Sequence, residues 1–384
     1  MTGVLYIVAS FKSGGTETQL LEILRRLDRR RFRPFVLTFR REGGLLPLFE
    51  NLGVEIFESR FDSLISARAA RCFRDLGRWI DERSIRVLHG FHFHGSLYGA
   101  LIKVMRPRVK LVICEQGLSG PAGWHIAAGR RFVYLTADVI LVNCEAVRRV
   151  LVERDGLDPG TVSIIYGGVD TEKFLYRDSR VRANGSGPVV GCVGRLHPDK
   201  GQVVLARAAS RIAESLPGVR ILLAGDGPQR PEVERILDEE GARDHVDLLG
   251  DHRDIPHLLA ELDLLVLPSM NEGFANAALE GMSTGLPVVV SDAGGNPEVV
   301  DHQVTGLVFR RGDPEALASA VVRICKDPEL ARSMGRAGRE RVTAIFGVDH
   351  LVRRHEEMYS DLVSGGPLKR GWDQGQRQGE GESA

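Results

Sequence analysis

The feature that most constrains this chain is an alternation of short apolar segments with amphipathic segments, which runs through the sequence twice. The first series of predicted strands lies at residues 4–8, 34–39, 55–57, 87–89, 111–114, 139–142 and 162–165. Helical patterns separate them at about 17–27, 45–52, 67–82 and 96–105. Because fully apolar short strands between helices are typical of a parallel sheet covered on both faces, the sequence predicts an α/β fold.

A polar, glycine-containing stretch at about 171–187 interrupts the pattern and is typical of a linker. The alternation then restarts, with predicted strands at 189–193, 221–223, 246–249, 264–267, 288–290 and 307–309. At 384 residues the chain is also too long for one compact core. We therefore expect two doubly wound, Rossmann-like domains that face a central cleft, where a ligand would bind.

The expected domain boundaries follow from these patterns. Residues 1–180 are expected to form an N-terminal Rossmann-like domain, and residues 185–345 a C-terminal Rossmann-like domain. A helix at 346–364 is expected to pack back on the N-terminal domain. Gly, Gln, Arg and Glu dominate residues 365–384, so this tail is expected to be disordered.

Charge and cysteine content exclude several classes of function. The 51 basic residues equal the 51 acidic ones, so nothing global favours nucleic acid. Five cysteines without paired spacing predict neither a disulfide framework nor a zinc site, which favours a reducing compartment. With no signal segment or membrane-spanning apolar run, we expect a cytoplasmic protein. Arginines bunched between residues 25 and 41 indicate a solvated face or, alternatively, peripheral contact with an anionic membrane on its inner face.

Two carboxylates, Glu272 and Glu280, flank a predicted turn and helix start after the strand at 264–267. On a single helix, eight positions would rotate them about 80° apart. With Glu272 in the loop and Glu280 on the helix, both can face one ligand. Gly273 would permit close backbone approach. The amides of the next three residues would form a helix N-terminus suited to phosphate: Phe274, Ala275 and Asn276.

A basic turn, with Arg195 and Lys200 five residues apart, follows the first strand of the second half. Arginine can grip phosphate oxygens in a bidentate way, and lysine adds a compact point charge. Alone, this turn is equally well explained as a capped turn with solvated charges. Together with the paired acids at matching loop ends, it favours a ligand site. No G-x-G-x-x-G fingerprint is present, which argues against a dehydrogenase.

These segments together resemble the retaining glycosyltransferases of family 4, also called glycosyl transferases group 1, which have the GT-B architecture. The resemblance covers about residues 3 to 360. In the second half it rests on the basic turn, Ala224–Pro228, Leu249-Gly250, Asp263, Pro268-Ser269, the pair Glu272 and Glu280, and Gly294–Glu298. In the first half it rests on Gly14–Glu17 and on Tyr166–Phe174.

The resemblance implies an enzyme that moves a sugar from a nucleoside-diphosphate sugar to a hydroxyl acceptor. Arg195 and Lys200 would neutralise the donor diphosphate. Glu280 would bind the ribose hydroxyls, and Glu272 would contact the transferred sugar. Further donor contacts are implied for Gly14, Gly15, Gly250 and His252, largely through backbone. The donor would be a UDP-sugar or GDP-mannose.

The implied reaction is a front-face attack by the acceptor hydroxyl, with the departing phosphate taking its proton. It requires no metal and no other cofactor. The acceptor would be a glycan, a lipid-linked molecule or a small molecule, used in exopolysaccharide, lipid-linked glycan or envelope glycoconjugate synthesis. Acceptor contacts are expected at Glu115, Gln116 and Trp124.

The chain departs from the family pattern at one histidine. Relatives carry His-x-His after the strand that ends here at His89, whereas this chain has Phe91 at the second position. We favour His94 as the active-site histidine, against a loop histidine that only packs or caps. Two other functions stay open, which are a nucleotide-sugar epimerase on the same architecture and a catalytically silent binding subunit.

Overall fold

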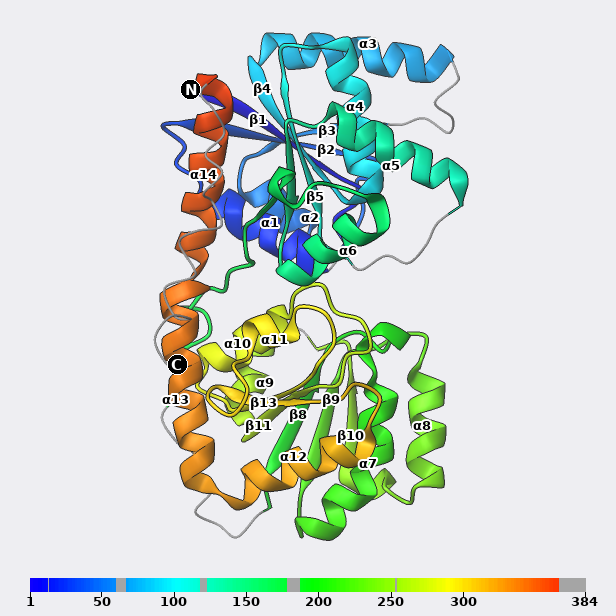
Figure 1. Ribbon diagram of the computed structural model, residues 1–384, viewed down its shortest axis with the longest axis vertical. Coiled ribbons are helices and arrows are strands. Elements are labelled where there is room, and N and C mark those ends of the chain that lie inside the picture. Colours follow the sequence, from blue (N-terminus) through cyan, green and yellow to red (C-terminus); the bar gives the residue numbers. More distant parts are fainter. Residues whose placement is uncertain (13, 60–66, 118–122, 178–186, 253, 366–384) are drawn as a thin grey trace. The chain divides into compact units, whose positions relative to one another are not determined.

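The computed structural model describes residues 1–12, 14–59, 67–117, 123–177, 187–252 and 254–365. The chain divides into two compact units. Unit 1 comprises residues 1–167 together with the C-terminal part from Val348, and unit 2 comprises Gly168–Gly347. Each unit has its own parallel sheet with helices on both faces (Figure 1).

Unit 1 contains a parallel sheet in the order β3-β2-β1-β4-β5-β6-β7. Its strands are β1 (Thr2–Val8), β2 (Phe32–Thr38), β3 (Glu55–Glu58), β4 (Ile85–Phe91), β5 (Lys110–Glu115), β6 (Val139–Val142) and β7 (Val162–Ile164). The predicted α/β fold is therefore confirmed. Strands β1 to β3 are added in succession toward one edge of the sheet, and strands β4 to β7 toward the other, so the switch point lies between β1 and β4. Ligands bind beside such switch points.

Helices cover both faces of this sheet. They are α1 (Gly15–Arg26), α2 (Leu46–Asn51), α3 (Ala67–Glu82), α4 (His92–Met105), α5 (Trp124–Thr136), α6 (Glu145–Asp155) and α14 (Val348–Ser364), with a 3-10 turn η1 (Pro159–Thr161). Apolar residues of α1 and α14 share one core with Val4 and Tyr6 of β1. On the other face, α4 lies so close that a side chain at Gly99 would meet Leu111.

Helix α4 begins at His92, so the prediction that it begins near Ser96 was wrong by about one turn. His92 adopts a left-handed φ of 55°, which lets the chain turn from β4 directly into the helix. A Cβ at Gly90 would lie 2.7 Å from the Gly95 carbonyl oxygen, so this tight connection depends on glycine.

Unit 2 repeats the arrangement with the parallel order β10-β9-β8-β11-β12-β13. Its strands are β8 (Val189–Val193), β9 (Arg220–Ala224), β10 (Val246–Gly250), β11 (Leu264–Leu267), β12 (Val288–Ser291) and β13 (Gly306–Phe309). Its helices are α7 (Gln202–Ser215), α8 (Arg230–Glu239), α9 (Ile255–Glu261), α10 (Asn276–Ser283), α11 (Asn296–Val299), α12 (Pro314–Lys326) and α13 (Pro328–Ile345), with 3-10 turns η2 (Pro198–Lys200) and η3 (Arg243–His245). The switch point of this sheet lies between β8 and β11.

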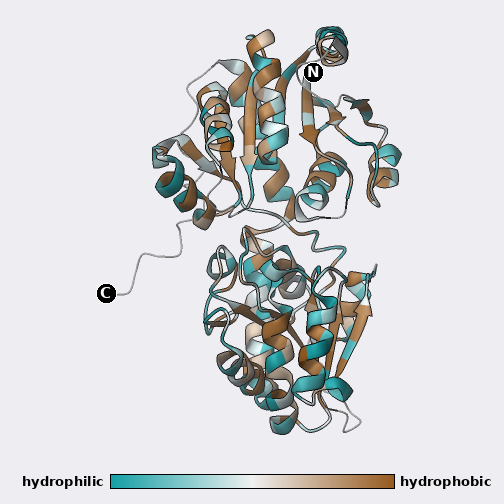
Figure 2. Cartoon of the chain, turned by 90° about the vertical axis from the view of Figure 1, so that its right-hand side faces the viewer, coloured by the Kyte–Doolittle hydropathy of each residue, from teal (hydrophilic) through white to brown (hydrophobic). Residues whose placement is uncertain are grey.

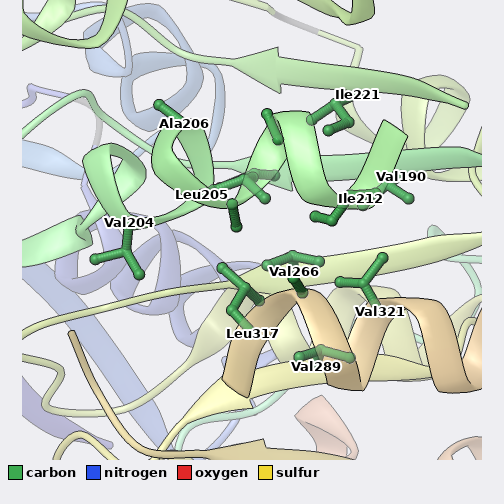
Figure 3. Packing of buried hydrophobic residues seen from close by; sticks show 14 of the residues in the cluster. Val190, Val204, Leu205, Ala206, Ile212, Ile221, Val266, Val289, Leu317 and Val321 are labelled. Atoms are coloured by element: carbon green, nitrogen blue, oxygen red, sulfur yellow. The ribbon is translucent and has the colours of Figure 1, made fainter. Parts of the chain in front are cut away.

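The core of unit 2 lies between its strands and the helices α7 and α12. Leu205 and Ile212 of α7 and Leu317 of α12 gather over Val190 and Val266 of the central strands (Figure 3). Each such side chain is almost fully buried, and its burial contributes about 1.5–3 kcal/mol to folding. The strands of both units are mostly hydrophobic, whereas the helices are hydrophilic on their outer sides (Figure 2).

The boundary between the units lies at Gly167/Gly168, earlier than the predicted boundary between residues 180 and 185. The reason is that the segment after Gly168 already packs on unit 2. Phe174 is buried, and its carbonyl oxygen accepts from Ser283 Oγ at 2.9 Å and from Arg339 Nη1 at 3.2 Å. Residues 178–186 of the predicted linker and 366–384 of the predicted tail lie outside the described residues.

Helix α14 belongs to unit 1, and it packs beside α1 and β4. Glu356 links it to the end of α1, because the Asp28 N–H donates to Glu356 Oε1 at 2.7 Å. In the described ranges, every helix is too short or too polar to cross a bilayer.

Candidate functional site

Two loops meet at the switch point of unit 2, the turn after β8 and the loop after β11. The carbonyl oxygen of Asp199 accepts hydrogen bonds from the N–H groups of Met270, at 2.8 Å, and Asn271, at 3.0 Å. Gly201 follows in a left-handed conformation with φ of 64°, and a Cβ there would lie 2.1 Å from the Pro268 carbonyl oxygen. Backbone hydrogen bonds therefore hold the two loops together, and the absence of a side chain at Gly201 permits their close approach.

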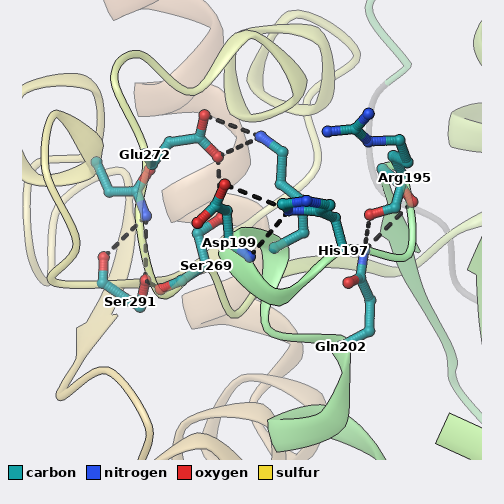
Figure 4. A network of polar contacts seen from close by, with 10 residues as sticks. Arg195, His197, Asp199, Gln202, Ser269, Glu272 and Ser291 are labelled. Carbon is teal, nitrogen blue, oxygen red and sulfur yellow. Dashed lines mark hydrogen bonds and ion pairs between the residues drawn. The ribbon is translucent and has the colours of Figure 1, made fainter. Parts of the chain in front are cut away.

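This approach brings Lys200 and Glu272 into direct contact (Figure 4). Lys200 Nζ donates to Glu272 Oε1 at 2.9 Å and to Oε2 at 2.7 Å. Ser269 Oγ donates to the same Oε2 at 2.9 Å. The Glu272 side chain is only 12% exposed and that of Lys200 37%, so the pair lies partly out of water, where charge interactions are stronger.

Arg195 lies on the same basic turn, and its backbone is fixed by Gln202. The Gln202 amide donates to the carbonyl oxygens of Gly194 and Arg195, at 3.2 and 3.1 Å. The Arg195 side chain is exposed, and within the described ranges its guanidinium pairs with no carboxylate (Figure 4). This turn therefore presents a cation beside the Lys200–Glu272 pair, at the end of the sheet where ligands bind.

The end of β10 contributes Gly250 and His252 to the same edge. The Gly225 N–H donates to the Gly250 carbonyl oxygen at 2.7 Å, which joins the loops after β9 and β10. His252 Nε2 is buried and has no hydrogen-bond partner among the described residues. A buried nitrogen in that condition is suited to a ligand that supplies the missing hydrogen bond.

Helix α10 begins at Asn276, after the loop that carries Glu272 and Gly273. Phe274 and Ala275 are buried, and the Phe274 ring packs edge-on against Phe346 at 5.9 Å. Their side chains therefore belong to the core of unit 2. Only the backbone of these two residues can contribute to a ligand site at the helix N-terminus.

Glu280 lies on α10, whereas Glu272 lies in the loop before it, as the sequence predicts. The Glu280 side chain is half-buried, and its carboxylate accepts no hydrogen bond from the described part of the chain. Burial raises the pKa of Glu280 to about 7, against an opposing effect of Lys173. Such a carboxyl is prepared to accept hydrogen bonds from a ligand.

Unit 1 places a second group of predicted residues at the carboxyl edge of its own sheet. Gly14 and Gly15 begin α1, and Thr16 Oγ1 donates to Gln116 Oε1 at 2.6 Å, so the loops after β1 and β5 are joined. Glu115 ends β5 and is buried; burial raises its pKa to about 7, while Arg130 opposes the shift. Trp124 is 83% exposed at the start of α5.

The histidines after β4 differ in their surroundings. His89 lies inside the sheet, fully buried, and its Nδ1 is 2.7 Å from Tyr359 Oη. His94 is exposed on the first turn of α4 beside the ring of Phe93, at a centroid distance of 5.6 Å. The pKa of His92 is lowered by desolvation and, to a smaller extent, by His94. His92 and His94 are both exposed and His89 is buried, so a ligand can reach the rings of the first two.

The bunched arginines at residues 25–41 are mostly engaged in ion pairs within unit 1. Arg25 and Arg26 pair with Glu22, Arg33 with Glu55 at 2.7 Å, and Arg41 with Glu50 at 2.6 Å. Their charge is therefore largely neutralised inside the molecule. This geometry favours a solvated face over the alternative, a patch for acidic lipids.

Comparisons with known proteins agree with this arrangement. Residues 13–173 match a family described as Glycosyltransferase Family 4, and residues 187–327 match a family described as Glycosyl transferases group 1. The chain belongs to glycosyltransferase family 4.

Two curated members of the family illustrate the range of likeness. A GDP-mannose-dependent alpha-(1-6)-phosphatidylinositol monomannoside mannosyltransferase of Mycobacterium tuberculosis is 34% identical over 306 residues, which cover 72% of this chain and 78% of that protein. A 2-deoxystreptamine glucosyltransferase of Streptomyces kanamyceticus is 32% identical over 220 residues, 56% of each protein. The match thus spans about half the length of the second relative.

Solved structures confirm the GT-B fold of this family 4 chain. Anabaena HepE in complex with UDP superposes with a TM-score of 0.81 at 24% identity, covering 94% of this chain and all of that one. Sucrose-phosphate synthase of Thermosynechococcus elongatus superposes with a TM-score of 0.78 at 21% identity, with 95% and 100% coverage.

Sequence reasoning assigned no role to three buried polar residues next to Glu272, namely Ser269, Ser291 and Asn296. The sequence did contain one sign that they could lie near the site, because each of the three follows an apolar strand segment directly or within a few residues. In the described ranges, no group of three or more His, Cys, Asp or Glu side chains could hold a metal ion.

Proposed function

We propose that this family 4 chain transfers a sugar from a nucleoside-diphosphate sugar to a hydroxyl acceptor with retention of configuration. The observation that carries the proposal is the contact of Lys200 with Glu272 at the switch point, beside the exposed Arg195. One turn thus offers two cations for a diphosphate, and the adjoining loop offers a carboxylate for a sugar.

The chemistry of these side chains fits loss of a phosphate leaving group. Arg195 can bind phosphate oxygens in a bidentate way, and Lys200 supplies a point charge. Stabilising the negative charge that develops on the leaving diphosphate lowers the barrier most effectively when the cations are already in place. The acceptor hydroxyl would attack from the face that the diphosphate leaves, and a phosphate oxygen would take its proton. Neither step requires a protein nucleophile or a metal ion.

The donor is proposed to be a UDP-sugar or GDP-mannose. Support comes from the names of relatives, which include a GDP-mannose-dependent mannosyltransferase and a UDP-Gal-dependent galactosyltransferase of Escherichia coli. In this chain Glu280 would bind the ribose, and Gly250 with His252 would face the base. Gly14 and Gly15 of unit 1 would allow close approach of backbone to the ligand.

The acceptor is proposed to bind at the edge of unit 1, to Glu115, Gln116 and Trp124, with His94 close to the reacting hydroxyl. The edge of unit 1 offers a buried carboxyl and an exposed indole, which together suit a molecule with both hydroxyl groups and an apolar part. A lipid-linked glycan has this character, and such an acceptor would place the enzyme in the cytoplasm, at the inner face of the membrane. Exopolysaccharide or envelope glycan synthesis would use such a product.

The test is donor turnover with purified variants. Lys200→Ala and Glu280→Ala are each expected to lower transfer of sugar to a cell lipid extract at least about 100-fold, because they remove charge and ribose contacts. Lys326→Ala and Glu214→Ala are matched controls, because both change exposed residues of unit 2. Turnover is measured as release of nucleoside diphosphate, with EDTA present to test metal independence.

Three outcomes would contradict the proposal. If Lys200→Ala and Glu280→Ala kept the wild-type rate, the site would be wrongly assigned. If the donor sugar were interconverted without any acceptor, the chain would be an epimerase. Donor binding without transfer to any acceptor fraction would instead identify a binding subunit.

A further inference from the structure

Three buried polar residues form a chain of hydrogen bonds that ends on Glu272 (Figure 4). Asn296 Nδ2 donates to the carbonyl oxygen of Ser291 at 3.0 Å and to its Oγ at 3.2 Å. Ser291 Oγ donates to the Ser269 carbonyl oxygen at 2.6 Å, and Ser269 Oγ donates to Glu272 Oε2 at 2.9 Å. We call these three residues the polar relay.

The polar relay crosses three separate elements of unit 2. Ser269 follows β11, Ser291 ends β12, and Asn296 begins α11. Their exposed fractions are 2%, 0% and 0%. Burying polar side chains costs free energy unless every group finds a partner, and small apolar residues would fill such positions at lower cost. The presence of three hydroxyl and amide groups in succession therefore points beyond packing.

One atom of the polar relay is left without a partner. Asn296 Oδ1 is buried and accepts no hydrogen bond from the described residues. A group selected only for stability would not leave a buried acceptor unsatisfied. Asn296 is therefore better explained by what its Nδ2 does, which is to orient Ser291.

The polar relay ends on the oxygen that also holds Lys200. Glu272 Oε2 accepts from Ser269 Oγ at 2.9 Å and from Lys200 Nζ at 2.7 Å. The Glu272 backbone is fixed as well, because its carbonyl oxygen accepts from the Gly295 N–H at 3.1 Å. A lysine has a flexible stem, and a carboxylate that is itself fixed restricts where the ammonium can lie.

We propose that Ser269, Ser291 and Asn296 are positioning residues that orient the Glu272 carboxylate and, through it, hold the Lys200 ammonium in place for the donor diphosphate. This inference rests on the proposed function, since it assigns the polar relay to the same donor site. The polar relay would aid catalysis by holding the charged groups in place before the reaction, which is called preorganisation. Charges fixed before the reaction need no rearrangement in the transition state, so a small displacement lowers the rate strongly.

The first test measures kcat and the donor Kd separately. Ser269→Ala is expected to lower kcat at least about tenfold while the donor Kd changes less than about threefold, and Ser269→Thr, which keeps the hydroxyl, is expected to recover most of the rate. Ser283→Ala is the matched control, because it also removes a buried hydroxyl that hydrogen bonds, to the Phe174 carbonyl oxygen, outside the polar relay. A wild-type kcat in Ser269→Ala, in an enzyme that Lys200→Ala inactivates, would overturn the relay and leave the proposed function intact.

A double-mutant cycle tests the route through Glu272. If Ser269 acts through that carboxylate, Ser269→Ala should cause no further loss of kcat in a Glu272→Ala background. Additive losses would overturn the inference.

The second test does not depend on turnover. Acetic anhydride is expected to modify Lys200 at least about twice as fast in Ser269→Ala as in the wild type, because the loosened Glu272 no longer holds the ammonium. Peptide mass spectrometry measures the modification, and Ser283→Ala should modify at the wild-type rate. Equal rates in Ser269→Ala and the wild type would overturn the inference even if the protein transferred no sugar.

Discussion

At the scale of single residues, the proposed role of Glu280 predicts that donor binding depends on pH. Burial raises the pKa of its carboxyl to about 7, and only the ionised form offers two charged oxygens as acceptors, one for each ribose hydroxyl. The ionised fraction falls about tenfold between pH 8 and pH 6. We therefore expect the Kd of a nucleoside diphosphate to rise about tenfold over that range, which isothermal titration calorimetry can measure.

The control is Glu280→Gln, which keeps the shape of the side chain and cannot ionise. Its Kd should show only the pH dependence of the ligand's own phosphate, so the difference between the two proteins isolates Glu280. Since the folded pKa exceeds the ordinary value of 4.5, this carboxyl also lowers folding stability progressively as the pH rises from 4.5 to about 7, and the loss persists at higher pH. Glu280→Gln is thus expected to be more stable than the wild type at pH 8. Equal pH profiles of Kd would show that Glu280 does not bind the ribose.

Sequence reasoning predicted which charged residues follow the strands of unit 2, but not how their side chains contact one another. Lys200, Glu272 and Glu280 could be predicted because charged residues after apolar strands gather at one edge of a parallel sheet. The ion pair of Lys200 with Glu272 joins residues 72 positions apart, and it depends on how closely two loops approach. The polar relay escaped prediction for the same reason, since only the fold brings Ser269, after β11, together with Asn296, at the start of α11.

At the scale of elements, the turn that carries Lys200 depends on Gly201. Gly201 has a left-handed φ of 64°, and a Cβ there would lie 2.1 Å from the Pro268 carbonyl oxygen. Gly241 has nearly the same φ, 63°, but no atom within 4 Å of its Cβ position. Gly241→Ala should cost only the conformational penalty, about 1–2 kcal/mol. Gly201→Ala should cost at least twice as much, because the two loops must also move apart.

Urea denaturation followed by circular dichroism gives both free energies of unfolding. Equal losses in the two variants would mean that the approach of the loops after β8 and β11 contributes nothing to stability.

The strands could be predicted because their apolar runs are unambiguous. The start of α4 could not, since a left-handed histidine at His92 has no signature in a hydrophobicity pattern.

At the scale of the whole molecule, α14 attaches to unit 1 through a buried polar cluster. His355 and Tyr359 of α14 lie against His89 of β4 and Tyr6 of β1. Burial lowers the pKa of His89 well below its ordinary value of 6.5, and it lowers that of His355 to about 4. The unfolded chain therefore binds more protons than the folded one between pH 6.5 and about pH 4.

This difference predicts a loss of stability in acid. Each of the two histidines contributes fully above pH 6.5, and its contribution falls by up to about 1.4 kcal/mol per pH unit as the pH drops toward 4. His355→Gln should reduce that slope, whereas His257→Gln, at an exposed position, should not. Tryptophan fluorescence in urea follows unit 1, because two of the three tryptophans, Trp79 and Trp124, belong to its described part and the segment 168–347 contains none. Identical slopes in all three proteins would contradict the role of His355.

The discontinuity of unit 1 has a consequence for synthesis on the ribosome. Unit 2 is one continuous segment whose ends are joined, since the Val169 N–H donates to the Phe346 carbonyl oxygen at 2.9 Å. It can therefore fold as soon as it leaves the exit tunnel. Of the two units, unit 1 begins to emerge before unit 2 and must wait for α14, which follows unit 2 in the chain, with the apolar face of β1 and β4 uncovered meanwhile. Of the two units, the one that starts to be translated first is thus completed last, and we expect nascent-chain chaperones to matter more for it than for unit 2.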